Sequence, residues 1–275
     1  MSPKFGRKLR GRVKRLFKRQ KSRPVEAGFR AASGLDYVTF FNRLHQQAAF
    51  DWYMEIGCRS GRIFSQAQGK TIAVDPFFQA ERNVIGAKPA LHVFQQTSDD
   101  FFADGFLASQ KIRLSVSFLD GMHLFEFLLR DFINTEARSR AEGVVLLHDC
   151  SPYDSAMTSR DYAGRRGLAW TGDVWKLIPI LQEHRPDLKV QVFDCAATGL
   201  VAVTNLDPDN RVLSDRYDAI VGAYRDMTLQ DFGVERFFSG FAHVDAAAEV
   251  AAGFPTFRPV MLDRSSLLQP EWASP

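Results

Sequence analysis

Four acidic residues of the chain each follow a short apolar run, at the point where a strand would end. Glu55 precedes a glycine turn in YMEIGCRSG, and Asp75 closes the run TIAVDP. Asp120 closes SFLDG, and residues 148–149 (HD) close GVVLLHD. The carboxyl ends of parallel strands meet at one edge of a sheet, so we expect these side chains around a single crevice.

The turn after Glu55 indicates what kind of ligand the crevice would take. Gly57 and Gly61 are spaced G-x-x-x-G, so the G-x-G-x-x-G pattern that seats a dinucleotide pyrophosphate is absent. The charge of Glu55 would repel a pyrophosphate and attract a cation. Asp75, 18 residues after Gly57, is placed to accept hydrogen bonds from ribose hydroxyls. A ligand with a ribose, a positive centre and no phosphate fits these features, and S-adenosylmethionine (SAM) is the common one.

EIGCRSG and IAVDP resemble the glycine loop and the ribose acid of the class I SAM-dependent methyltransferases. By this resemblance Glu55, Gly57 and Gly61 border the methionine part of the cofactor, and Asp75 binds its ribose. Arg59 is a departure from the family pattern, because many members have a glycine at that place.

TSDDFF, at residues 97–102, follows the third expected strand. Ser98 or Asp99 is in position to cap the next helix, and Ser98 is the favoured cap. This region borders the adenine in class I methyltransferases, so the resemblance makes Asp99 a candidate cofactor contact.

DGMHLFE, at residues 120–126, is similar to a D-G-x-H-x-aromatic-E stretch in a methyltransferase subgroup that acts on small molecules and sugars. The HD pair at residues 148–149 resembles the same subgroup, and the whole resemblance spans roughly residues 50–205. Asp120 is therefore assigned both to the cofactor site and to the catalytic residues.

Methyl transfer from a sulfonium needs an aligned nucleophile and a base that removes its proton. We expect His123, about one turn past Asp120, to be that base, with Asp120 and His148 as further catalytic residues. The alternative for His123 is a helix-start residue that only caps or packs. The reaction implied is O-methylation of a small-molecule or glycan acceptor.

A divalent cation held by Asp120 and Asp149, with His148 as a further candidate ligand, is an alternative way to activate the acceptor hydroxyl. Several related families use oxygen ligands from these two strand ends with magnesium. A histidine suits a softer metal better than magnesium. Asp149 has a second reading, as a cap for the segment that follows.

Short apolar runs alternate with longer amphipathic stretches from about residue 50 to residue 205. This alternation predicts an α/β fold, a doubly wound and mostly parallel seven-stranded sheet of the Rossmann-like methyltransferase type. One helix is expected from about Ser60 and a long one from Met122 to about Ala141. Residues 151–172 are polar and irregular, and predict a long loop. We expect acceptor specificity to come from this loop and from the C-terminal helices.

The chain is expected to divide into a basic amphipathic tail (1–25), a SAM-binding domain (26–205) and a helical C-terminal extension (206–275). The first 23 residues carry eleven Lys and Arg and no acid, while the net charge of the whole chain is +3. Contact of this tail with an anionic membrane is one expectation, and a solvated arm is the other. No recognised motif supports a nucleic-acid partner.

Three widely spaced cysteines argue against a disulfide framework or a zinc ribbon. No apolar run reaches bilayer length, and no apolar segment of a secretory signal follows the basic start. We therefore expect a cytoplasmic protein, with the inner membrane face as the site of any peripheral contact.

Two other functions fit an α/β sheet of this kind. An NAD(P)-dependent oxidoreductase is disfavoured by the missing third glycine, by the charge of Glu55 and by the lack of a Tyr-x-x-x-Lys pair. A non-catalytic binding or scaffold protein is disfavoured because Asp75 and Asp120 are both present. The sequence alone names neither the acceptor nor an oligomeric state.

Overall fold

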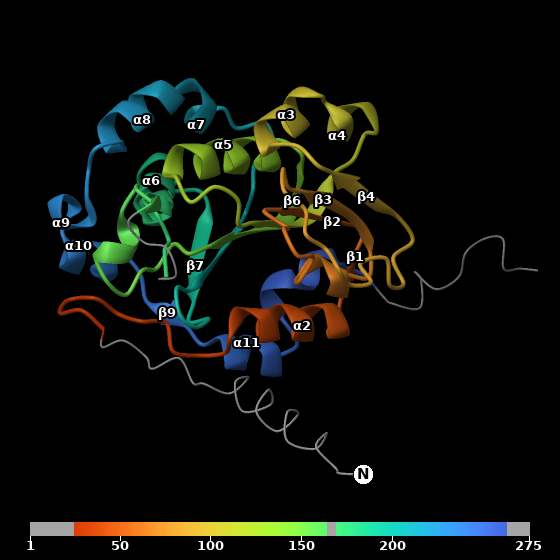
Figure 1. Ribbon diagram of the computed structural model, residues 1–275, viewed down its shortest axis with the longest axis horizontal. Helices are drawn as coiled ribbons and strands as arrows, with labels where there is room; N and C mark the ends of the chain where they lie inside the picture. The colour runs from red at the N-terminus through yellow and green to blue at the C-terminus, as the bar shows by residue number, and fades with distance from the viewer. Residues whose placement is uncertain (1–24, 164–168, 263–275) are drawn as a thin grey trace, which may run out of the picture.

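The computed structural model describes residues 25–163 and 169–262, so the basic tail predicted for residues 1–25 lies outside the described residues except for Val25. An eight-stranded sheet forms the centre of the molecule (Figure 1), in the order β4-β3-β2-β5-β6-β8-β7-β9. Its strands are β2 (Trp52–Ile56), β3 (Lys70–Val74), β4 (Leu91–Phe94), β5 (Leu114–Leu119), β6 (Ser139–His148), β7 (Lys189–Phe193), β8 (Leu200–Thr204) and β9 (His243–Val244).

Every described strand of this sheet except β8 runs in the same direction, since β8 pairs antiparallel with both β6 and β7. The predicted doubly wound, mostly parallel α/β fold is confirmed, with one strand more than the seven expected. The extra strand, β9, is two residues long and comes from the C-terminal segment, so no run of alternating residues announces it. A separate two-stranded sheet pairs β1 (Ala49–Phe50) with β10 (Met261–Leu262).

Helices cover both faces of the sheet (Figure 1). On one face lie α3 (Ser98–Ala103), α4 (Phe106–Ser109), α5 (Phe125–Glu136) and α6 (Leu177–His184), followed by α7 (Val212–Asp215), α8 (Tyr217–Tyr224), α9 (Leu229–Phe232) and α10 (Val234–Ser239). On the other lie α2 (Tyr37–Gln47) and α11 (Ala246–Ala251). Successive strand residues alternate between the two faces. Met54 therefore packs in one core cluster and Tyr53 in the other.

Two expected helices differ from the structure. The helix predicted from about Ser60 is wrong, because the segment holds only the 3-10 helix Phe64–Gln66. Arg59 and Gly61 both have positive φ, at 32° and 70°, and this conformation cannot continue into a right-handed helix. The helix predicted from Met122 to Ala141 is shorter, at Phe125–Glu136, because β6 already begins at Ser139.

The part of the chain beyond residue 205 packs on both core clusters and adds β9 to the sheet. The division into a SAM-binding domain at 26–205 and an extension at 206–275 stays a prediction. In the described ranges no helix combines the length and the apolar character that a bilayer crossing requires.

Candidate functional site

A cavity of about 1100 Å³ opens at the carboxyl ends of β2, β3 and β5. The strand order reverses at β2, and open α/β sheets bind their ligands at such a switch point. Of the predicted site residues, those that line the cavity are Glu55, Gly57, Asp75, Asp99, Asp120 and His123. Gly61, His148 and Asp149 are not among its lining residues, although the last two contact the side chains of Asp120 and His123.

Gly57 brings the ends of β2 and β5 into contact. It has a φ of 86°, and a Cβ built on it would lie 2.0 Å from the carbonyl oxygen of Asp120. Only glycine allows this backbone conformation together with so close an approach. The turn after β2 and the DG dipeptide after β5 are thereby held against one another at the floor of the cavity.

Asp75 holds the glycine turn through backbone hydrogen bonds. Its carboxylate accepts from the backbone N–H of Arg59 at 2.7 Å and of Phe77 at 2.6 Å. Arg59 stands in the left-handed region, and its side chain is exposed at the cavity.

Glu55 is a buried acid at the end of β2, only 2% exposed. Its carboxylate accepts a hydrogen bond from the Tyr53 hydroxyl at 2.9 Å. Burial raises the pKa of Glu55 to about 8, against the opposing effect of the Tyr53 bond. Such a group ionises readily only when a cation approaches it.

Asp99 is held by a partner that the sequence did not indicate. Arg130 of α5 donates to both of its carboxylate oxygens, at 2.9 and 2.6 Å, and also donates to the Tyr217 hydroxyl. The helix cap predicted here is corrected: Thr97 caps α3 with its side chain, and Ser98 is the first helical residue. The cofactor role of Asp99 stays a prediction.

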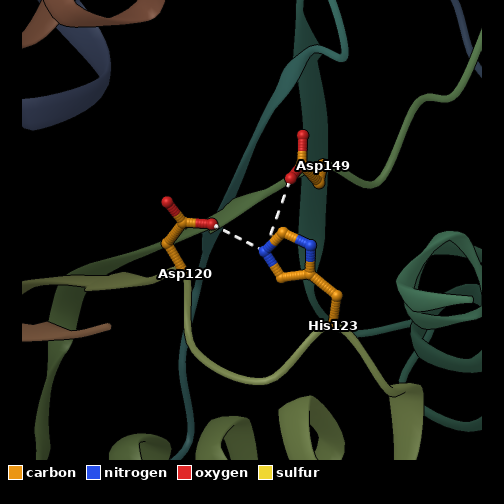
Figure 2. Close-up of side chains that lie close together, drawn as sticks. All are labelled: Asp120, His123 and Asp149. Atoms are coloured by element: carbon orange, nitrogen blue, oxygen red, sulfur yellow. Dashed lines mark ion pairs between the residues drawn. The ribbon is translucent and has the colours of Figure 1, made fainter. Parts of the chain in front are cut away.

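The reacting end is a cluster of two carboxylates and two imidazoles. Figure 2 shows His123 between Asp120 and Asp149, with its Nε2 atom 3.4 Å from an oxygen of Asp120 and 3.5 Å from one of Asp149. The Nδ1 atom of His148 lies 3.2 Å from Asp120 and 3.4 Å from Asp149. Tyr37 of α2 packs its ring on His148, with 4.2 Å between the ring centroids.

The charges in this cluster compensate each other. Burial alone would lower the pKa of His123, but its hydrogen bond with Asp120 and the charge of Asp149 outweigh burial and raise the pKa to about 9. The pKa of His148 is raised for the same reason, against its burial. Burial works to raise the pKa of Asp120 and of Asp149, but the charge of His148 outweighs it and both are lowered. These shifts favour the charged forms of both histidines and both aspartates.

Residues 170–173 fix the position of His123, although no motif in the sequence indicates this contact. The Nδ1 atom of His123 lies 3.0 Å from the carbonyl oxygen of Trp170, whose ring stacks on the imidazole. A Cβ on Gly172 would lie 1.7 Å from the carbonyl oxygen of His123, so the two backbones touch. Asp173 accepts from the first amide of α5, Phe125, at 2.9 Å. A bond from Nδ1–H to Trp170 leaves Nε2 directed at the two aspartates.

Asp120, His123 and Asp149 could hold a metal ion. One ligand atom from each lies within 4.8 Å of the others, and they form the candidate metal set among residues 25–163 and 169–262. Two carboxylate oxygens and an imidazole nitrogen form a set that divalent transition metals accept. The structure thus places His123 beside the two predicted ligands, Asp120 and Asp149, as a third candidate ligand.

Comparison with known families supports the fold and class of the site. Residues 54–150 match a family model described as a methyltransferase domain. The predicted resemblance to class I SAM-dependent methyltransferases is confirmed over this segment. The subgroup motifs at residues 120–126 and 148–149, and the roles of the predicted site residues, stay predictions. No curated protein matches the chain.

Three solved structures illustrate the likeness. MycE methyltransferase from the mycinamycin biosynthetic pathway is 14% identical, over 63% of this chain and 49% of its own, with a TM-score of 0.40. Rv0187 from MTB is 14% identical over 63% and 80%, with a TM-score of 0.47. The O-methyltransferase TomG from Streptomyces achromogenes is 16% identical over 61% and 77%, with a TM-score of 0.41. The chain spans about half of MycE.

Proposed function

We propose that the protein is a SAM-dependent O-methyltransferase that acts on a hydroxyl of a small-molecule or glycan acceptor. The observation that carries the proposal is that Glu55, Asp75, Asp120 and His123 line one cavity, with His148 and Asp149 in contact with the last two. SAM would supply a methyl group on a sulfonium. The methyltransferase match over residues 54–150 supports the same class.

Each acid of the cavity would have a distinct role in this function. Glu55, which is buried and bonded to the neutral Tyr53 hydroxyl, would ionise against the positive methionine end of the cofactor. Asp75 accepts two backbone N–H bonds and has lone pairs left for ribose hydroxyls. Asp120 adjoins both the glycine turn and His123, so it would align the reacting ends.

His123 would receive the proton of the acceptor hydroxyl at Nε2, the atom that Trp170 leaves free. Because its pKa is raised, His123 must first lose the proton that it carries in the metal-free protein. His148 would stay protonated between Asp120 and Asp149 and hold them in place. Asp149 is fixed independently, because it accepts from the Thr198 hydroxyl at 2.6 Å.

A divalent cation held by Asp120, His123 and Asp149 is the second arrangement that the donor set fits. The cation would lower the pKa of the acceptor hydroxyl and orient it. In that arrangement His123 is a ligand and not the base. Unchanged turnover in excess EDTA would exclude this arrangement, and turnover restored by Mn²⁺ or Mg²⁺ after chelation would support it.

Aromatic rings beside His123 support an acceptor with an apolar or sugar face. Tyr162 is 54% exposed, and its ring lies 5.0 Å from that of Trp170, which in turn stacks on His123. Rings of this kind cover the apolar faces of ligands and keep a polar edge toward water. These residues come from the predicted specificity loop at 151–172.

Calorimetry with S-adenosylhomocysteine (SAH) tests the proposed function. We expect micromolar affinity, which corresponds to about −8 kcal/mol, and no binding of NAD. Asp75→Ala should lose this binding, while His123→Ala should keep it and lose SAH formation from SAM on an acceptor found in a panel of hydroxyl compounds. Binding of NAD in place of SAH would favour the oxidoreductase, and binding of neither would favour the scaffold protein.

A further inference from the structure

Tyr37, the first residue of α2, carries a hydroxyl group without a protein partner at the cavity. Its ring packs on His148 with 4.2 Å between the centroids, and its side chain lines the cavity. Within residues 25–163 and 169–262 the hydroxyl group makes no hydrogen bond, and it is not one of the unpaired side-chain atoms that are buried. The hydroxyl group is therefore accessible from the cavity and free to bind a ligand.

Tyr37 and Trp170 approach the aspartate pair from opposite faces of the sheet. His148 packs on Tyr37 and on Phe118, which both contact the core cluster on the α2 face. His123 packs on Trp170 and lies two residues before α5, which covers the other face. Each imidazole of the cluster thus has one aromatic ring beside it, and an acceptor that reaches His123 lies between the two rings.

The sheet order separates Tyr37 from the proposed cofactor contacts. Glu55 and Asp75 stand at the ends of β2 and β3, while His148 is the last residue of β6. Strand β5 lies between β2 and β6. Because Tyr37 packs on His148, it borders the part of the cavity beyond Asp120, where an acceptor and not the cofactor would lie.

The chemistry of the group is that of a hydrogen-bond donor. Burial raises the pKa of Tyr37, and the charges of Asp120 and Asp149 act in the same direction against those of His148 and Arg62. The phenol is therefore un-ionised at neutral pH, so it donates its O–H and does not serve as the base. Its natural partner is an oxygen atom of the molecule that enters the cavity.

We propose that Tyr37 is an acceptor-binding residue, whose hydroxyl group donates to a second oxygen of the acceptor while His123 receives the proton of the hydroxyl that is methylated. This inference rests on the proposed SAM-dependent function and narrows its substrate class to acceptors with at least two oxygen atoms. Tyr37 precedes residues 54–150, so the contact comes from outside the segment that matches the methyltransferase model.

The test uses pairs of acceptors that differ by one oxygen. The probes are catechol and resorcinol, each against phenol, and methyl α-D-glucopyranoside against its monodeoxy analogues. For the pair that the wild type methylates, kcat/KM for SAH formation should be about tenfold higher with the complete member, as expected for one hydrogen bond. Tyr37→Phe should raise KM for the complete member about tenfold, leave kcat unchanged, and have no effect on the member that lacks the oxygen.

Tyr224→Phe is the matched control. The Tyr224 hydroxyl on α8 donates to Glu183 at 3.0 Å, and Tyr224 does not line the cavity. We expect it to change neither KM nor the preference within a pair. Calorimetry should give the same SAH affinity for the wild type, Tyr37→Phe and Tyr224→Phe, because the proposed contact is with the acceptor alone.

A merely structural role for Tyr37 predicts different results. Phenylalanine keeps the ring on His148, so a packing role would leave Tyr37→Phe with wild-type kinetics and confine the loss to Tyr37→Ala, which would overturn the inference. A fall in kcat alone, equal for both members of a pair, would place the hydroxyl at the reacting oxygen and would also overturn it. If the wild type binds SAH and only the preference fails to change, the inference alone is wrong; if it binds no SAH, the proposed function falls with it.

A measurement without turnover covers the case in which none of these probes is methylated. In protein labelled with ¹³C at the tyrosine Cζ atoms, the signal missing from Tyr37→Phe belongs to Tyr37. With SAH present, the complete members of the pairs should shift this signal, and the members that lack an oxygen should shift it less. A signal that none of these compounds moves would overturn the inference.

Discussion

Glu55 and Asp120 stand at the ends of two paired strands, yet their pKa values are displaced in opposite directions. Glu55 of β2 pairs with Phe118 of β5, two residues before Asp120, which directly follows the last residue of β5. Burial raises the pKa of Glu55 to about 8. Burial also acts on Asp120, but the charge of His148 and the bond with His123 outweigh it, so the pKa of Asp120 is lowered.

The difference lies in where each acid finds its positive partner. Glu55 is bonded to the neutral Tyr53 hydroxyl, and its interaction with the charge of Lys88 does not offset its burial. Asp120 has two histidines of the protein itself. Glu55 thus becomes charged when a cationic ligand binds. The cluster around Asp120 is already charged, and its carboxylates can bind protons or a metal ion.

Asp120→Asn should have the largest effect, because it removes the carboxylate that both histidines share. We expect SAH formation on the acceptor that the wild type methylates to fall about 1000-fold, or about 4 kcal/mol in activation free energy. Calorimetric affinity for Mn²⁺ should fall as well. Asp218→Asn is the control on a remote helix, and turnover of Asp120→Asn equal to that of the control would remove Asp120 from the reacting end.

Gly57→Ala should increase the distance between Glu55 and Asp120. The new Cβ would meet the Asp120 carbonyl at 2.0 Å with φ at 86°, so the ends of β2 and β5 must move apart. We expect a loss of about 3 kcal/mol in the free energy of unfolding, measured by urea denaturation, and a loss of SAH affinity. Gly222→Ala in α8 is the control, because nothing lies within 4 Å of its new Cβ. A Gly57→Ala protein as stable as that control would show that the contact is dispensable.

The sequence predicted the parts of this arrangement that depend on strand ends. Strands β2, β3, β5 and β6 are apolar runs, and parallel strands deliver the next residue to one edge, so Glu55, Asp75 and Asp120 could be located before any coordinates. The two-residue strand β9 carries no periodic signal. The turn after β2 differs from the predicted helix because Arg59 has a positive φ, which its residue type does not indicate.

The missing parts of the site are tertiary contacts between distant segments. Trp170 meets His123 across 47 residues through a backbone carbonyl, which any residue type could supply. Arg130 donates hydrogen bonds to the carboxylate of Asp99, which lies 31 residues earlier in the chain.

The pH dependence of stability should show whether His123 is paired as an imidazolium with the two aspartates. A histidine whose folded pKa is raised stabilises the fold fully below its unfolded pKa of 6.5, and this contribution is lost as the pH rises through about 9. In EDTA, the wild type should therefore exceed His123→Asn in unfolding free energy by on the order of 2 kcal/mol at pH 6, and the gap should close by pH 10. His92→Asn on β4, where His92 packs on Trp52 and Phe106, is the control. A gap that stays constant across this range would mean that His123 is not paired as an imidazolium.

Glu55→Gln tests the other side of the comparison, with the smallest expected effect. Because the cationic SAM favours the ionised form of Glu55, SAM affinity of the wild type without acceptor should rise about tenfold from pH 6.5 to 8.5, as the pH passes the raised pKa of about 8. The glutamine cannot ionise, so its SAM affinity should be weaker and nearly flat over this range in calorimetry. Asp75→Asn provides the contrast, since it should weaken SAM binding without altering the slope. Equal slopes in the wild type and Glu55→Gln would place the titrating group elsewhere and would mean that Glu55 does not face the cationic end of the ligand.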